Sequence, residues 1–274
     1  MEKPDESKGE RIAKRMARAG LCSRREAEKW IEAGRVAVNG NILTSPAMAV
    51  TDDDEITIDG QRLAGKEKTR LFLYHKPAGL VTTARDEKGR KTVFEALPPG
   101  LPRVVSVGRL DITTEGLLLL TNDGELSRYL ELPATGWLRK YRVRAHGRVT
   151  QQRLDHLKKG LRWKGVNYAP MTAALESQQG ANVWIEIAIA EGKNREVRNV
   201  MESLGLVVNR LIRTSYGPFH LGNLPKGAVL EIRPKMLAEQ IPGFFKKKKD
   251  PEGKGQKNKD QKNKDQKNKD KGGA

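Results

Sequence analysis

The stretch Gly108-Arg109-Leu110-Asp111-Ile112-Thr113-Thr114-Glu115-Gly116, continued by Leu117-Leu118-Leu119-Leu120-Thr121-Asn122-Asp123-Gly124, decides how most of this chain folds. Four leucines are too few to cross a bilayer, so the run predicts a buried strand that ends in a turn at 122–124. Asp111 then lies in a loop at the rim of a packed sheet. A rigid scaffold can direct a loop carboxylate at a substrate from there, although a loop Asp is more often a turn former or a helix cap.

The length and composition exclude several classes of protein. With 274 residues, the chain has room for one domain of ordinary size and a smaller one. The only cysteine, Cys22, excludes an internal disulfide and fits a reducing compartment. There is no apolar signal segment at the N-terminus and no long apolar run. We therefore expect a cytoplasmic protein that does not associate with membranes.

The positive charge of the chain is unevenly distributed. Of the net charge of +18, residues 66–245 contribute +12 and residues 246–274 contribute +7, whereas residues 1–65 contribute −1. The body is therefore basic without the tail, which favours an anionic polymer as partner. Three copies of Gln-Lys-Asn-Lys-Asp between 256 and 270 predict a disordered, Lys-rich tail over 246–274. Such a tail either adds sequence-blind affinity for phosphates or is a solvated stalk.

Residues 10–65 form a candidate small domain. A helix is expected over 11–19, ending at Gly20, and Ser23 with Glu26 three residues later predicts a capping box that opens a second helix. Short strands are expected at 35–38, 41–43 and 55–58. The segment 11–35 holds eight basic residues against three acidic ones. This asymmetry suits a helical face on phosphates, and equally an ordinary solvated face.

A larger domain is expected over 70–240, after a polar linker. Its strand-like runs outnumber its helical patterns, which predicts an α+β domain with a mixed, mostly antiparallel sheet. The turn Lys76-Pro77-Ala78-Gly79 is given a structural role. The expected strands lie near 71–74, 79–83, 104–107, 117–121, 139–145, 182–189, 206–213 and 228–232, and the expected helices near 125–131, 150–158 and 194–204.

The segment 108–124 resembles the catalytic motif of the RNA pseudouridine synthases, and residues 17–40 resemble the S4 RNA-binding domain of the α-L type. Together they resemble the bacterial ribosomal-RNA pseudouridine synthases that carry an S4 domain in front. The segments 195–198 and 209–217 favour the large-subunit branch. The resemblance implies isomerisation of a specific uridine to pseudouridine in ribosomal RNA, 23S rather than 16S, by a monomer. Naked RNA and a ribosome assembly intermediate both remain open as substrates.

The resemblance also implies roles for individual residues. Asp111 is expected to be the nucleophile, Tyr141 to stack on a flipped-out base, and Arg198 to pair with Asp111. Attack at C1′, attack at C6 and elimination through a glycal remain open. From spacing alone, Tyr141 reads as a core residue and Arg198 as the partner of Glu202 on a helix. The basic residues expected to contact RNA are Arg11, Arg15, Arg18, Arg24, Arg25, Arg109, Lys193 and Arg195.

No cofactor and no metal are expected. The sequence has neither a P-loop nor a dinucleotide-binding glycine motif, and its four histidines are scattered. Two other functions compete with the synthase. The first is a catalytically silent S4-type RNA-binding or ribosome-assembly factor. The second is a hydrolase that uses a carboxylate pair, Asp111 with Glu115 or Asp123.

Overall fold

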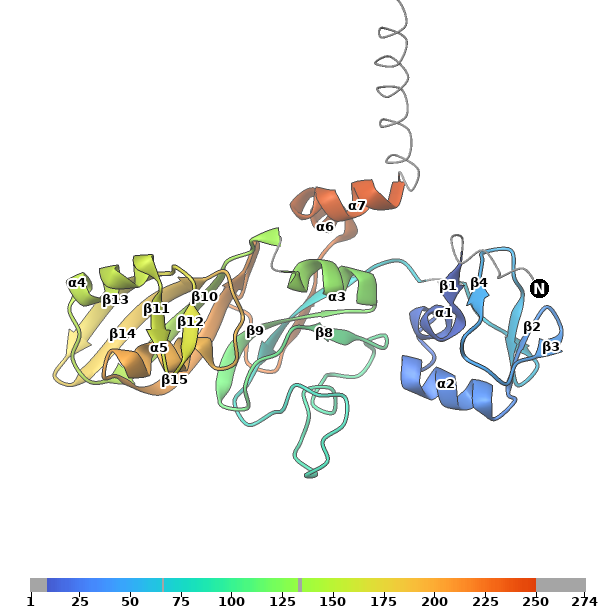
Figure 1. Cartoon of the computed structure of the whole chain (residues 1–274), viewed down its shortest axis with the longest axis horizontal. Helices are drawn as coiled ribbons and strands as arrows, with labels where there is room; N and C mark the ends of the chain where they lie inside the picture. The colour runs from blue at the N-terminus through green and yellow to red at the C-terminus, as the bar shows by residue number, and fades with distance from the viewer. Residues whose placement is uncertain (1–8, 66, 133–134, 250–274) are drawn as a thin grey trace, which may run out of the picture. The chain divides into compact units, whose positions relative to one another are not determined.

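The computed structural model describes residues 9–65, 67–132 and 135–249 (Figure 1). The chain divides into two compact units, residues 1–232 and residues 233–274. The described part of the second unit consists of helices α6 (Pro234–Gln240) and α7 (Pro242–Lys249), each beginning with a proline in its first turn. Helix α7 overlaps the start of the tail predicted over 246–274, and the rest of that tail lies outside the described residues.

The N-terminal domain has the predicted helices and hairpin. Ser23 and Glu26 form the capping box of α2, with Ser23 Oγ accepting from the backbone N of Glu26 at 3.1 Å. Ile12, Met16 and Ile31 are fully buried in the core. The helices are α1 (Ile12–Arg18) and α2 (Arg24–Glu32); a four-stranded sheet has the order β3 (Asn41–Ile42), β2 (Val36–Val38), β5 (Ile56–Ile58), β6 (Gln61–Arg62), and β1 (Glu10–Arg11) pairs with β4 (Ala49–Val50).

A sheet of nine described strands forms the larger domain, which confirms the α+β prediction. The pairing of β9 with β15 is parallel and the other pairings in this sheet are antiparallel. The order is β13 (Thr172–Gln179), β14 (Asn182–Ile189), β10 (Arg139–His146), β15 (Val207–Tyr216), β9 (Thr114–Thr121), β7 (Leu71–Lys76), β17 (Val229–Glu231), with β16 (Phe219–His220) on β15 and β8 (Val105–Val107) on β9.

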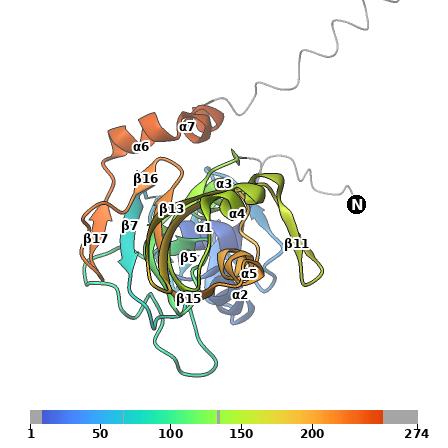
Figure 2. The same ribbon diagram turned by 90° about the vertical axis from the view of Figure 1, so that its left-hand side faces the viewer.

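Helices α3, α4 and α5 pack against strands of this sheet. Asp123 accepts from the backbone N of Glu125 at 2.9 Å and so caps α3 (Gly124–Glu131), as the expected turn after the leucine run requires. Figure 2 shows α4 and α5 on one side of strands β13 to β15. The remaining elements are α4 (Gln151–Asp155), the 3-10 helix η2 (His156–Lys159), β11 (Leu161–Trp163), β12 (Val166–Tyr168) and α5 (Glu196–Ser203).

One strand prediction was wrong, and several strands of the larger domain were not predicted. The run 79–83 forms only an isolated bridge between Val81 and Thr92, and the positive φ of Gly79 at its start is incompatible with a regular extended strand. Conversely, the short strands β11, β12 and β16 were not expected, and neither was the eight-residue β13. It is an edge strand with mostly exposed residues, so it lacks the regular apolar alternation that indicates a half-buried strand.

The leucine run is the centre of the sheet. All eight residues of β9 are buried, and Leu117 to Leu120 have no exposed surface. Because β9 lies between β7 and β15, its burial fixes where the strand begins, at Thr114. The loop that carries Asp111 is thereby held at the edge of a rigid core.

Gly116 allows β9 and β15 to pair closely. Its φ is +103°, and a Cβ at this position would lie 2.3 Å from the carbonyl oxygen of Arg213, which is its partner in the parallel ladder. No L side chain fits without moving one of the two strands.

We predict that Gly116→Ala destabilises the protein by at least about 3 kcal/mol, because it combines backbone strain with a clash against another backbone. Gly79→Ala is the matched control: its φ is +92°, but a Cβ there meets no atom within 4 Å. It should cost about 1–2 kcal/mol from strain alone. Urea denaturation measures both, and equal losses would contradict the close-packing argument.

Candidate active site

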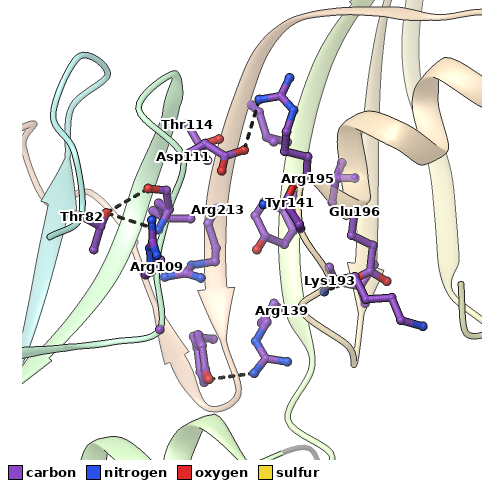
Figure 3. Close-up of a pocket in the computed structure, with 18 of the residues that line it drawn as sticks. Thr82, Arg109, Asp111, Thr114, Arg139, Tyr141, Lys193, Arg195, Glu196 and Arg213 are labelled. Atoms are coloured by element: carbon purple, nitrogen blue, oxygen red, sulfur yellow. Dashed lines mark hydrogen bonds and ion pairs between the residues drawn. The ribbon is translucent and has the colours of Figure 1, made fainter. Parts of the chain in front are cut away.

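A cavity of about 920 Å³ opens where the Asp111 loop meets the ends of β10 and β15 (Figure 3). Asp111, Tyr141, Arg195 and Arg213 all line it. These residues come from four separate segments of the chain, and the sheet brings them together. The cavity therefore places the expected nucleophile and the expected aromatic residue in one site.

Lys76 anchors the loop that carries Asp111. Its side chain is fully buried, and Nζ donates to the carbonyl oxygens of Pro77 at 3.0 Å, Asp111 at 3.2 Å and Thr114 at 2.9 Å. Burial lowers the pKa of Lys76 to about 8, although the negative charges of Asp111 and Glu115 oppose the shift. From the sequence, Lys76 was assigned to a turn, and its hydrogen bonds to the Asp111 loop were not predicted. These hydrogen bonds join Lys76 to residues that lie 35 and 38 positions further along the chain.

The carboxylate-pair hydrolase is not supported, because both proposed partner carboxylates are engaged elsewhere. Glu115 accepts from Arg210 at 2.8 Å and pairs with Lys226 at 2.7 Å, and the hydrogen bond from Arg210 is the main reason why its pKa falls to about 2. Asp123 caps α3 and accepts from the hydroxyl of Thr69 at 2.7 Å. Neither is free to act with Asp111 as an acid or a base.

The ion pair with Asp111 is made by Arg195. Arg195 Nη1 lies 3.6 Å from Asp111 Oδ2, and both side chains are partly exposed. Arg195 is the N-cap of α5 and has a left-handed backbone with φ 50°, a conformation that costs about 1–2 kcal/mol for a residue with a side chain. Figure 3 shows the two side chains pointing toward one another.

Arg198, which was expected to pair with Asp111, lies one turn further along α5 and points at the base of the loop. Its Nη2 donates to Thr113 Oγ1 at 2.9 Å and its Nη1 to the carbonyl of Val208 at 3.3 Å. Burial lowers the pKa of Arg198, Arg195 adds to the effect, and Asp111 opposes it. The structure thus attaches Arg198 to the loop two residues after Asp111, and the salt bridge predicted for it is made by Arg195 instead.

Tyr141 presents its ring to the cavity from β10. The residue is 8% exposed and belongs to the buried face of the strand with Val143 and Ala145. It is therefore both a core residue and a wall of the cavity, so the two readings of its sequence pattern are compatible.

The basic residues predicted to contact RNA differ in how free they are. On α1, Arg15 pairs with Asp52 and Glu10, and Arg18 donates to Glu10 at 2.6 Å, so both charges are partly neutralised. Lys193 pairs with Glu191 at 2.8 Å. Within the described parts of the chain, no ion pair is found for four exposed arginines: Arg11, Arg24, Arg25 and Arg109.

Two findings bear on metals and membranes. Among the described residues, no three His, Cys, Asp or Glu side chains gather closely enough to hold a metal ion. None of the described helices has the length and hydropathy that crossing a membrane requires.

We predict that Lys76→Met removes a pH dependence of stability. Below pH 8 the wild-type lysine is protonated in both states, whereas between pH 8 and 10.5 only the unfolded chain holds the proton. The difference in unfolding free energy between wild type and variant should therefore rise with pH across this window, by on the order of 3 kcal/mol. Denaturant titrations at a series of pH values measure it, and a difference that stays flat would contradict the burial argument.

Comparison with known proteins identifies the family of both domains. Residues 70–203 match the family model described as RNA pseudouridylate synthase, and residues 10–56 match the S4 domain. An RNA pseudouridine synthase of Rickettsia prowazekii is 46% identical, over 84% of this chain and 97% of the relative. Ribosomal large subunit pseudouridine synthase B of Salmonella typhi is 42% identical, over 81% of this chain and 79% of the relative.

Among solved structures, a crystal structure of a pseudouridylate synthase superposes with a TM-score of 0.59 at 27% identity, and the match covers 85% of this chain and 99% of the other. The fold and these relatives agree, and the chain belongs to the RNA pseudouridine synthase family, with an S4 domain ahead of the catalytic domain.

Proposed function

We propose that this enzyme converts one uridine of the large-subunit ribosomal RNA to pseudouridine, with Asp111 as the nucleophile. The observation that carries the proposal is the cavity in which an arginine-paired carboxylate and the ring of Tyr141 meet. Asp111 is partly exposed, and a cation beside a carboxylate nucleophile orients it and balances its charge. Arg195 supplies that cation.

Access to the reacting atoms dictates how the RNA binds. C1′ and C5 of a uridine in folded RNA are reachable only if the nucleotide leaves its stack. The ring of Tyr141 offers the extruded base a flat surface, and stacking of this kind is worth about 1–3 kcal/mol per base. Arg109, exposed beside Asp111 and lining the same cavity, can occupy the space that the base leaves behind.

The choice of 23S RNA rests on the named relatives and on the S4 domain. The Salmonella relative is named for the large ribosomal subunit, and the match to it extends over both domains. In the S4 domain the exposed arginines Arg11, Arg24 and Arg25 are the candidates for phosphate contacts, ahead of the paired Arg15 and Arg18.

We predict that the wild-type protein releases tritium from 23S RNA labelled at C5 of uridine, and that Asp111→Asn releases none above background. The variant keeps the volume of the side chain but removes its charge. Asp155→Asn, a surface carboxylate paired with Lys158, is the control and should leave the rate unchanged. If wild type and Asp111→Asn are equally active, the nucleophile is misassigned. RNA binding without tritium release by the wild type would instead indicate the silent RNA-binding factor.

The two arginines of α5 should differ in their effects. We propose that Arg198 holds the Asp111 loop through Thr113, whereas Arg195 screens the carboxylate at the surface. Arg198→Met should lower the single-turnover rate by about 10²-fold, the loss expected when a reacting group is misplaced by about 1 Å. Arg195→Met should cost about tenfold or less, because half-exposed ion pairs contribute only about 0–1 kcal/mol. Rapid-quench kinetics would settle the ranking, and the reverse order would contradict it.

A further inference from the structure

Arg213 is a buried cation without a counter-ion. It lies on β15, is 2% exposed, and donates from Nε to the carbonyl oxygen of Leu117 at 2.7 Å. No carboxylate of the described residues forms an ion pair with it. Its Nη2 is buried and has no hydrogen-bond partner among those residues. A buried charge is normally paired, so this arrangement calls for an explanation.

The surroundings of Arg213 increase the free-energy cost of burying its positive charge. Its positive charge contributes to lowering the pKa of buried Lys76, which shows that the two cations repel one another. The adjacent acid, Glu115, is already engaged by Arg210 and Lys226. Glu115 is therefore not available as a counter-ion for Arg213.

A purely structural role explains only part of the side chain. Nε satisfies the carbonyl of Leu117, and the guanidinium lies 5.2 Å from the centre of the Tyr216 ring, within the range of a cation–π contact. These two contacts leave Nη2 unused. A lysine or an uncharged residue would fill this core position and leave fewer hydrogen-bond donors without a partner.

The position of Arg213 points to the base. Arg213 is the cross-strand partner of Tyr141 in the pairing of β10 with β15, so the two side chains leave the sheet next to one another on the same face. Both line the cavity, and Figure 3 shows them beside each other below Asp111. A uracil stacked on Tyr141 would present its edge to the guanidinium.

We propose that Arg213 is a further catalytic residue, which donates to a carbonyl oxygen of the target uracil and stabilises the base as it departs. This inference rests on the proposed function. In each of the three routes open to Asp111, the C1′–N1 bond breaks and its electron pair stays with the base. The charge then spreads over N1, O2 and O4, and a fixed guanidinium is a suitable partner for it.

The remaining atoms balance without another reactant. In the direct route the carboxylate of Asp111 bonds to C1′, and this C1′–O bond breaks when the base rejoins the sugar. In the glycal route C2′ loses a proton to Asp111, which returns it at that step. In the route through C6 the carboxylate adds to C6 of the base, and this C6–O bond breaks after the base has rejoined the sugar. C5 of the turned base then bonds to C1′, and the proton on C5 leaves to solvent. Arg213 takes no proton and forms no covalent bond, and it lowers the energy of the anionic base between the two steps.

The test compares two leaving groups in single-turnover reactions. Fluorine at C5 makes the uracil anion more stable. Cleavage of the C1′–N1 bond in a 5-fluorouridine RNA therefore depends less on stabilisation of the departing base by the enzyme. Arg213→Gln should lower the rate of loss of the target nucleoside by about 10²–10³-fold with uridine RNA. With 5-fluorouridine RNA the loss should be smaller by on the order of tenfold, as expected when a better leaving group depends less on stabilisation. The RNA dissociation constant should stay within about threefold of wild type.

Two controls keep the outcomes separate. Arg142→Gln removes an arginine beside Tyr141 on β10 that faces away and pairs with Glu176, and it should leave both rates unchanged. If Arg213→Gln does not fold by circular dichroism, Arg213→Lys carries the same comparison. Equal losses with both RNAs, or weakened RNA binding at an unchanged rate, would overturn the inference and indicate a structural role or a phosphate contact. An active wild type with an inert Asp111→Asn would leave the proposed function standing in that case.

Discussion

The parallel pairing of β9 with β15 is the constraint on which the site depends. It requires a residue without a side chain at Gly116, because the carbonyl of Arg213 approaches within 2.3 Å of where a Cβ would be. The same contact fixes three things at once: the start of β9 and hence the Asp111 loop, the register of Arg213, and through β10 the position of Tyr141. A single close backbone approach thus links the position of Asp111 to that of Tyr141.

Several features that lower the stability of the folded protein lie near this part of the sheet. Lys76 is buried with its pKa lowered to about 8, Arg213 is buried without a counter-ion, and Arg195 has a left-handed backbone. Such features lower stability and persist only where the surrounding structure enforces them. The fully buried leucines of β9 and the ion pairs of Glu115 hold this part of the sheet in place.

Much of this architecture could be predicted from the sequence because local patterns carry it. The leucine run, the Ser23–Glu26 capping box and the alternation around Tyr141 each correspond to the observed element. The polar contacts of the site could not be predicted in the same way. Lys76 reaches a loop 35 residues away, and which arginine of α5 meets Asp111 depends on the strained turn at Arg195. The spacing of residues along a helix predicts which of them share a face, but not the angle at which the helix packs beside the site.

A structure of Asp111→Asn bound to an RNA stem-loop that the wild type modifies would test the central claim most directly. We expect the target uridine to lie outside its helix with the base on the ring of Tyr141, C1′ facing residue 111, and a carbonyl oxygen within hydrogen-bond distance of the Arg213 guanidinium. A target base that stays stacked in the RNA, or that binds away from this cavity, would contradict the account.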